Sequence, residues 1–197
     1  MIPLGILSMV ALAIIIERLW MLRSRNFLQP ATVQTLSGLL ASNKYRGAVE
    51  YCRRHPGPFT GLVTALVENR QAPYDELKQI LEDTGRLQLM GLQRGLPALA
   101  TIVAGAPLLG LLGTVIGMIK IFAVVATAGS SITEQLSSGI SQALITTATG
   151  LVIAIPALFT HAYLESRAVG ILSDIEAQIL DFLHLVREHE KDSDEEE

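Results

Sequence analysis

Charged residues are scarce in this 197-residue sequence, at 17% of the chain, whereas an average soluble domain has roughly 25%. Cysteine is scarcer still: Cys52 is the single one, which excludes an internal disulfide framework and any cysteine-rich zinc or iron–sulfur site. The four histidines are scattered, and no phosphate-binding loop of the Gly-x-x-x-x-Gly-Lys-Ser/Thr type occurs. We therefore expect no metal, no cofactor and no enzymatic activity, and no nucleic acid among the partners.

Half of the residues are apolar, the mean hydropathy is +0.42, and the apolar residues are gathered into blocks. Three runs have no charged side chain: residues 1–16, 95–119 and 135–160. A helix needs about 20 mostly apolar residues to cross the hydrocarbon core of a membrane. The second and third runs reach this length, and the first reaches it when it is extended to Leu22. The sequence therefore predicts three transmembrane helices, over residues 1–22, 96–128 and 140–163.

Two other interpretations of these runs are weaker. A signal peptide has a basic segment before its apolar run, but no basic residue precedes residues 1–16, and Glu17-Arg18-Leu19-Trp20 follows them. Buried helices of a soluble protein would not be expected to include two charge-free runs of this length in so short a chain.

The distribution of charge predicts the orientation. The segment from Arg18 to Arg94 holds eleven Lys/Arg and six Asp/Glu, whereas no Lys or Arg precedes the first span. Because positively charged flanks stay in the cytoplasm, we expect a periplasmic N-terminus and a cytoplasmic C-terminus. Lys120 lies near the outer end of the second span, where its long side chain can reach water. The segments outside the spans are then a cytoplasmic helical region over 23–95 and a periplasmic link over 129–139.

The cytoplasmic segments are expected to be helical. His55-Pro56-Gly57-Pro58 divides residues 23–95 into two pieces, and Pro73 marks the start of a further helix. After the third span, one apolar stripe has helical spacing and needs another helix to bury it. Its residues are Leu164, Ala168, Ile171, Ile175, Ile179, Phe182 and Val186.

We therefore predict an all-α membrane protein with three transmembrane helices, in which the second and third helices extend into a cytoplasmic helical bundle. The third continues as one helix over 164–190 and ends in an acidic, disordered tail over 191–197. From Glu165 onward there are eleven acidic and three basic residues. This excess indicates either solubility or pairing with the basic segment 18–94.

Small and hydroxyl-bearing residues recur at helical spacing in the second and third spans. Small residues let two helices approach closely in lipid, and the close-packing candidates are Gly110, Gly113, Gly117, Ala143, Gly150 and Ala154. A polar seam through the membrane would consist of Thr114, Thr147 and Gln142, although the same hydroxyls could serve helix packing alone. Expected helix kinks are Pro107 and Pro156, and expected interfacial anchors are Arg18, Trp20 and Arg23.

The two spans have no carboxylate, histidine or lysine at mid-depth. A threonine hydroxyl does not titrate in the accessible pH range, so it can orient a proton or a water molecule but cannot store a proton. If the chain helps to move protons, the titrating acid must come from another subunit.

These residues resemble a known family. The segments Ala106–Ile119, with Phe122, and Ile140–Ala157 are similar to the second-span and third-span signatures of the MotA/TolQ/ExbB proton-channel family. Glu17-Arg18 and Arg94-Gly95-Leu96 extend the likeness over nearly the whole chain. The modest cytoplasmic region favours the ExbB/TolQ branch over MotA.

The resemblance implies a homo-oligomeric ring, a pentamer in the inner membrane, around a dimer of an ExbD/TolR-like single-span partner that carries one essential Asp. It implies coupling of proton-motive force to a TonB/TolA-like protein and so to transport across the envelope. The family's lumen-facing threonines correspond to Thr114 and Thr147. The family often has a Glu where this chain has Gln142, so no acid of this chain lines the predicted channel. The alternative is a non-conducting helical membrane scaffold.

Overall fold

The computed structural model describes residues 2–23, 27–125 and 132–195, but not the side chains of residues 23, 124–125, 132–136 and 188–195. The described residues form helices and contain no strand, as an all-α protein requires. The helices are α1 (Ile2–Arg23), α2 (Pro30–Ala41), α3 (Tyr45–Arg54), α4 (Pro58–Glu68), α5 (Tyr74–Leu92), α6 (Leu96–Val125) and α7 (Ile132–Glu195).

Three of the helices, α1, α6 and α7, are long and apolar enough to cross a membrane. This confirms the three predicted spans and the all-α membrane class. The chain divides into two compact units: a first unit of residues 1–21 and 95–165, and a second unit of residues 22–94 and 166–197. Helix α7 contributes to both, so the predicted continuation of the third span as one helix is confirmed.

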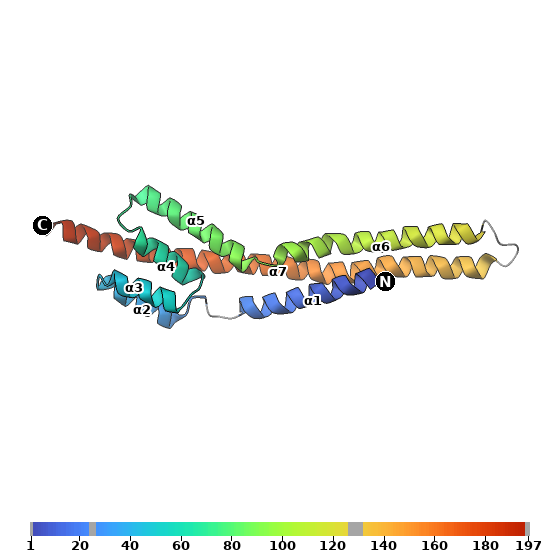
Figure 1. Cartoon of the computed structure of the whole chain (residues 1–197), viewed down its shortest axis with the longest axis horizontal. Helices are drawn as coiled ribbons and strands as arrows, with labels where there is room; N and C mark the ends of the chain where they lie inside the picture. The colour runs from blue at the N-terminus through green and yellow to red at the C-terminus, as the bar shows by residue number, and fades with distance from the viewer. Residues whose placement is uncertain (1, 24–26, 126–131, 196–197) are drawn as a thin grey trace. The chain divides into compact units, whose positions relative to one another are not determined.

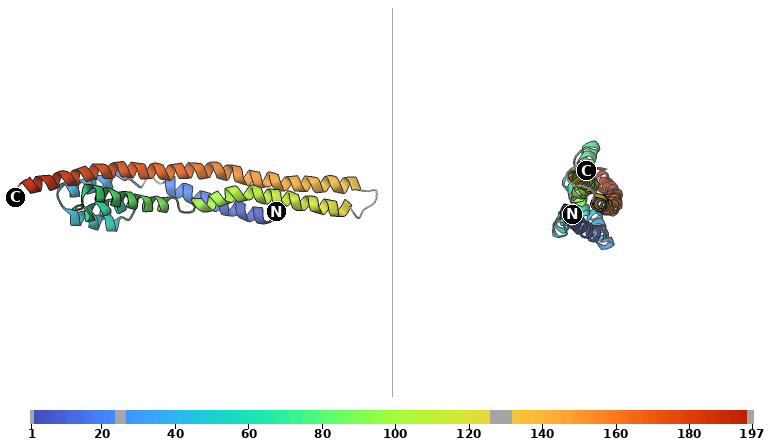
Figure 2. Two further views of the ribbon diagram at one scale, coloured as in Figure 1. Left: turned by 90° about the horizontal axis from the view of Figure 1, so that it is seen from above. Right: turned by 90° about the vertical axis from the view of Figure 1, so that its right-hand side faces the viewer.

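In the first unit, α6 and the neighbouring part of α7 run side by side in both views (Figures 1 and 2). Helix α1 packs on this pair through a face that repeats about every seven residues, with Leu4, Ala11 and Arg18 all buried. Leu4 forms a small core with Ala106 of α6 and Ala154 of α7. The rest of the pair's surface carries exposed apolar side chains, as expected for helices that face lipid or other apolar helices.

The second unit is a helical bundle in which α2, α3, α4 and α5 pack in sequence order. Its core includes the apolar stripe of α7 predicted from the sequence, and Phe182 lies 5.8 Å from Phe59 of α4, centroid to centroid. From Ala168 to Val186 every residue of the stripe is at most 5% exposed. The expectation that this stripe packs against another helix is thereby confirmed.

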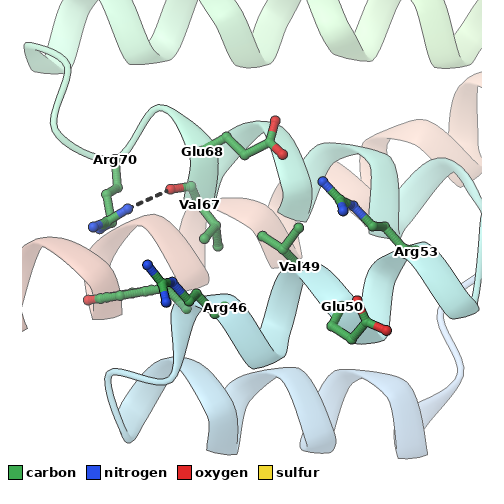
Figure 3. Close-up of a pocket in the computed structure, with 8 residues that line it drawn as sticks. Arg46, Val49, Glu50, Arg53, Val67, Glu68 and Arg70 are labelled. Atoms are coloured by element: carbon green, nitrogen blue, oxygen red, sulfur yellow. Dashed lines mark hydrogen bonds between the residues drawn. The ribbon is translucent and has the colours of Figure 1, made fainter.

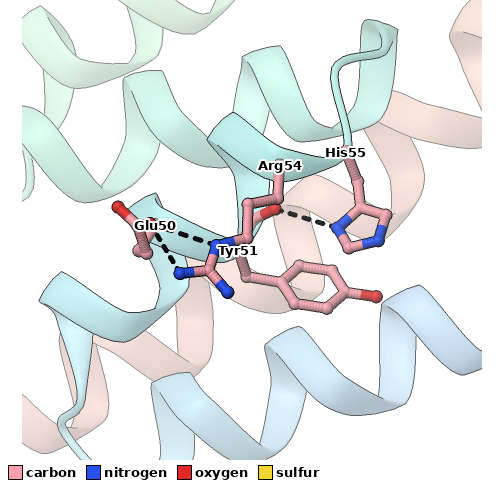
Figure 4. Close-up of polar contacts among 4 residues, drawn as sticks. All are labelled: Glu50, Tyr51, Arg54 and His55. Carbon is pink, nitrogen blue, oxygen red and sulfur yellow. Dashed lines mark hydrogen bonds and ion pairs between the residues drawn. The ribbon is translucent and has the colours of Figure 1, made fainter.

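The break between α3 and α4 falls at His55–Gly57, as the proline and glycine residues predicted. The Thr60 hydroxyl closes the turn by donating to the His55 and Gly57 carbonyls, at 2.8 and 3.1 Å. At the end of α3, Arg54 pairs with Glu50 and the His55 ring stacks on Tyr51 at 4.4 Å (Figure 4). These contacts fix the helix end with exposed groups and leave Thr60 buried beneath it.

The second span, α6, and the last helix of the cytoplasmic region, α5, are separate helices. Helix α5 ends at Leu92 and α6 begins at Leu96, with Gly95 between them in the left-handed region at φ 85°. A side chain at this φ is strained, and a Cβ there would lie 3.3 Å from Nε of Arg18. The helix therefore stops where only glycine fits.

The limits of α7 also differ from the expected ones. Helix α7 begins at Ile132, inside the expected 129–139 link, and it contacts α6 at Gly139, where a Cβ would lie 2.5 Å from Cγ1 of Ile121. It also continues to Glu195, through most of the tail expected to be disordered. No proline or glycine follows Gly170 to end the helix. Residues 126–128 of the expected second span, 129–131 of the expected link and 196–197 of the expected tail lie outside the described residues.

The two prolines of the spans lie inside helices that continue past them. Proline has no N–H, so the carbonyls of Val103 and Val152, one turn earlier, lack their usual helical donor. The kinks expected at Pro107 and Pro156 stay predictions.

Candidate functional site

The contact between α6 and α7 is built from residues without large side chains. A Cβ added to Gly150 would lie 2.6 Å from the Ala106 carbonyl oxygen, and one added to Gly110 would lie 3.0 Å from the Thr146 carbonyl oxygen. Along the same line, a Cβ on Gly117 would meet Ala143 at 2.8 Å. The two backbones are thus as close as glycine allows, which is the geometry that small residues provide in lipid.

Gly113 belongs to the same contact, because a Cβ there would lie 2.5 Å from the Thr146 hydroxyl. Ala143 and Ala154 are buried, at 4% and 5% exposure. All six small residues singled out in the sequence therefore lie where α7 meets α6 or, for Ala154, where it meets α6 and α1.

Three threonine hydroxyls lie along this contact, and they differ in their hydrogen bonds. The Thr114 hydroxyl donates to the Leu111 carbonyl of its own helix at 2.7 Å. The Thr146 hydroxyl is 2.6 Å from the Ala143 carbonyl and 3.3 Å from the Gly110 carbonyl across the interface. Both are thus occupied by backbone acceptors.

Thr147 is different. Its hydroxyl oxygen is buried and has no hydrogen-bond partner among the described residues. A buried hydroxyl without a partner costs roughly 1–3 kcal/mol. Thr147 faces Gly110, and Thr114 follows Gly110 by one turn of α6, so the hydroxyls of Thr114 and Thr147 lie on adjoining turns of two packed helices.

Gln142, the third member of the predicted polar seam, is exposed on α7. Five residues separate it from Thr147, which places the two about 140° apart around the helix axis. Gln142 and Thr147 therefore do not share one face of α7.

The predicted interfacial anchors differ in their placement. Trp20 is 84% exposed. Arg18 is only 6% exposed: its guanidinium lies beside Gly95, with Glu17 at 3.3 Å and the sulfur of Met21 at 3.6 Å. It is packed into the first unit, rather than reaching freely toward an interface. The Arg23 side chain lies outside the described residues.

Among the described residues, no group of three or more His, Cys, Asp or Glu side chains could hold a metal ion. The stretch of α6 and α7 around Thr114 and Thr147 offers hydroxyl groups, which can donate and accept a hydrogen bond but cannot hold a charge.

Helical spacing and the family resemblance selected Thr147 rather than its neighbour Thr146, but neither predicts which of the two hydroxyls has a hydrogen-bond partner. Both are threonines in the same apolar run. The Thr146 hydroxyl is bonded to the Ala143 carbonyl of its own helix and has the Gly110 carbonyl as a second acceptor, whereas the Thr147 hydroxyl has no partner among the described residues.

Comparison with known proteins identifies the family. The profile of the MotA/TolQ/ExbB proton channel family matches residues 57–177, which include the α6–α7 contact and both threonines. The chain belongs to the MotA/TolQ/ExbB family. This confirms the resemblance seen in the two span signatures.

Relatives within the MotA/TolQ/ExbB family carry ExbB names. A protein named ExbB-like 1 from Synechocystis sp. is 34% identical over 171 residues, which are 84% of this chain and 66% of the relative. ExbB-like 3 from the same organism is 30% identical over 85% of this chain and 83% of its own length. The biopolymer transport protein ExbB of Aquifex aeolicus is 36% identical over 44% of this chain and 58% of its own length. The chain is therefore an ExbB/TolQ-like, multi-pass membrane protein.

Proposed function

We propose that this chain is the ring-forming subunit of an inner-membrane proton-channel motor of the ExbB/TolQ type. It would couple proton-motive force to a TonB- or TolA-type protein and so to the transport of biopolymers or nutrients across the envelope. Family membership supports the channel, and the unpartnered, buried hydroxyl of Thr147 is the observation in this chain that supports a polar pathway.

Thr147 and Thr114 form the polar part of this pathway. Because the buried Thr147 hydroxyl has no acceptor among the described residues, a carboxyl group or a water molecule that enters between α6 and α7 could accept its proton or donate to its oxygen. Thr114 already donates to Leu111, but its oxygen still has lone pairs that accept a hydrogen bond.

The titrating group of the pathway must come from a partner. Residues 95–119 and 135–160 contain no acid or base, and Gln142 cannot replace an acid in storing a proton. The partner that fits is an ExbD/TolR-like protein with one span and one Asp in that span, present as a dimer within a pentameric ring of this chain. A protonated Asp beside Thr147 would supply the missing hydrogen-bond partner.

The energy available is adequate for such a motor. One charge that crosses a potential of 100 mV yields about 2.3 kcal/mol. Interfaces between packed helices have discrete arrangements that differ by a few kcal/mol, so a few protons suffice to drive a change between two of them. In this arrangement the N-terminus is periplasmic and the C-terminus cytoplasmic, as the Lys/Arg distribution requires.

The test is partner-dependent proton flux into liposomes, measured for Thr147→Val. Valine keeps the volume of threonine and removes the hydroxyl, so we expect flux to fall about tenfold or more, as typically follows the loss of a hydrogen bond to a reacting group. Thr147→Ser, which keeps the hydroxyl, should retain most of the flux.

Thr146→Val is the matched control, because this hydroxyl is already bound to backbone carbonyls. It should affect assembly more than conductance per assembled complex. If Thr147→Val conducts as well as the unmodified chain, the hydroxyl has no role in the pathway. If the unmodified chain conducts no protons with its partner, the protein is a scaffold rather than a channel.

A further inference from the structure

A pocket of about 330 Å³ lies between α3 and α4 in the second unit. Arg46, Val49, Glu50 and Arg53 follow one another at spacings of three and four residues, so they line it from one face of α3. Val67 and Glu68 from the end of α4 and Arg70 just beyond it complete the opposite wall (Figure 3). The valines give the pocket an apolar floor, and the charged groups form its rim.

Some charged side chains of the pocket already have a partner, and others have none. Glu50 is paired with Arg54 at 3.0 Å, and Arg70 donates to the Val67 carbonyl and lies 4.6 Å from the Tyr45 ring centre. In contrast, neither Arg46 nor Arg53 has a hydrogen bond or an ion pair within the part of the chain that the structure describes. Two guanidinium groups thus remain available at the rim.

The pocket suits an acidic peptide better than a phosphate group. Arginine binds carboxylates through paired N–H donors. A phosphate carries its full charge at one point and would be repelled by Glu50 and Glu68 at the same rim. A peptide can place carboxylates on the arginines and a cationic side chain near Glu68.

The end of this chain has that composition. Residues 188–197 include seven acidic side chains and one lysine, Lys191. Arg187 donates to the Ala72 carbonyl in the loop between α4 and α5, two residues beyond Arg70. The acidic segment therefore begins close to the level of the pocket.

The chain's own acidic segment is poorly placed to enter this pocket. Helix α7 continues without a turn to Glu195, and in Figure 3 it runs behind α3 and α4, on the side away from the labelled rim residues. In a closed ring, rotation about one axis relates the copies, so the acidic segment of each copy begins at the same height as the α4–α5 loop of its neighbours, next to the pocket.

We propose that the pocket between α3 and α4 binds the acidic C-terminal segment, residues 188–197, of a neighbouring copy of this chain. This rests on the ring of the proposed function. The contact would join adjacent subunits outside the membrane through Arg46 and Arg53, and the apolar floor would exclude water from part of it.

Cross-linking between two differently tagged copies tests this, in a Cys52→Ala background. One copy carries Val49→Cys in the pocket floor, and the other carries Ser193→Cys in the acidic segment; neither change alters a charge. A short bismaleimide should give a product that carries both tags. Gln34→Cys, an exposed position on α2 outside the pocket, is the control and should give none.

Charge reversal then tests whether the arginines of the pocket bind the acidic segment through ion pairs. Arg46→Glu with Arg53→Glu in the pocket copy should lower the yield about fivefold, as expected for two partly exposed ion pairs. Glu190→Lys with Asp192→Lys in the other copy should restore it. Arg86→Glu, on α5 outside the pocket, should leave the yield unchanged.

The outcomes separate this inference from the proposed function. A ring that persists in native mass spectrometry without the mixed-tag product overturns the inference and leaves the proposed function intact. A yield of the mixed-tag product that charge reversal does not change also overturns the inference. The absence of a ring in the unmodified protein would instead overturn the proposed function.

Discussion

The close approach of α6 and α7 makes Gly150 the position most sensitive to one added methyl group. In Gly150→Ala the new Cβ would lie 2.6 Å from the Ala106 carbonyl oxygen, whereas ordinary contacts begin at 3.4 Å. The obstructing atoms belong to the backbone, so no side-chain rotation relieves the contact. The helices must separate locally by about 0.8 Å, the difference between these two distances.

Gly150→Ala lowers the free energy of unfolding because it overpacks the contact between α6 and α7. Forcing a methyl group into a close-packed contact costs roughly 1–3 kcal/mol. Alanine also gains about 0.5–1 kcal/mol over glycine in a helix interior, which offsets part of the cost. Gly105→Ala in α6 has the same helical gain, but its Cβ would meet nothing within 4 Å. The difference in the free energy of unfolding between Gly150→Ala and Gly105→Ala therefore measures the cost of the overpacked α6–α7 contact alone, roughly 1–3 kcal/mol.

Thermal unfolding in detergent, followed by far-ultraviolet circular dichroism, measures this difference. For a chain of this size, 1 kcal/mol shifts Tm by about 2–4 °C, so Gly150→Ala should melt about 2–12 °C below Gly105→Ala. Equal melting temperatures would refute the reasoning, because α6 and α7 would then not be in backbone contact at Gly150. A lower proton flux per complex in Gly150→Ala would follow if the same separation displaces Thr147.

The remaining predictions concern the second unit. Burial raises the pKa of the Cys52 thiol, although the hydrogen bond of the Thr64 hydroxyl opposes this in part. The thiol should therefore react with a maleimide at pH 8 far more slowly in the native protein than in the unfolded chain. Equal rates would contradict its burial. The pKa of Cys52 is higher in the folded than in the unfolded chain, so the contribution of its neutral thiol to the free energy of unfolding is fully present below the unfolded pKa of about 8.5. This contribution is lost as pH rises through the folded pKa, and Cys52→Ala should abolish the loss. Phe182→Ala should lower the free energy of unfolding by roughly 3–5 kcal/mol, because it leaves a cavity beside Phe59, and it should accelerate the labelling of Cys52. The control Leu180→Ala, at a half-exposed position on the same helix, should not accelerate it. Similar labelling of both variants would show that Phe182 is not a core residue.

Much of the fold could be predicted from residue patterns, because the signals are local. The three charge-free runs predict three spans, since membrane crossing depends on length and apolarity alone. The break at His55–Pro58 and the buried stripe of α7 follow from turn residues and helical periodicity. The left-handed conformation of Gly95 between α5 and α6 was not predicted, because sequence does not show φ.

The candidate site was only partly predictable. Periodicity places Gly110, Thr114 and Thr147 on helix faces, but not opposite one another, because the partner of a face depends on how two helices are aligned along their axes. The same holds for Arg18, whose burial beside Gly95 depends on the packing of α1 on α6.

The sequence by itself determined that this protein is helical, that it crosses a membrane three times, and that its spans hold no titratable group at mid-depth. These properties are sums over composition and spacing, so they do not depend on which helices touch. Tertiary structure alone decided that the Gly110 carbonyl of α6 is a second acceptor for the Thr146 hydroxyl while that of Thr147 has no partner among the described residues, and that Arg46 and Arg53 meet Glu68 and Arg70 around one pocket. Hydrogen bonds and pockets require atoms from different helices to come within a few ångströms, and only packing sets those distances.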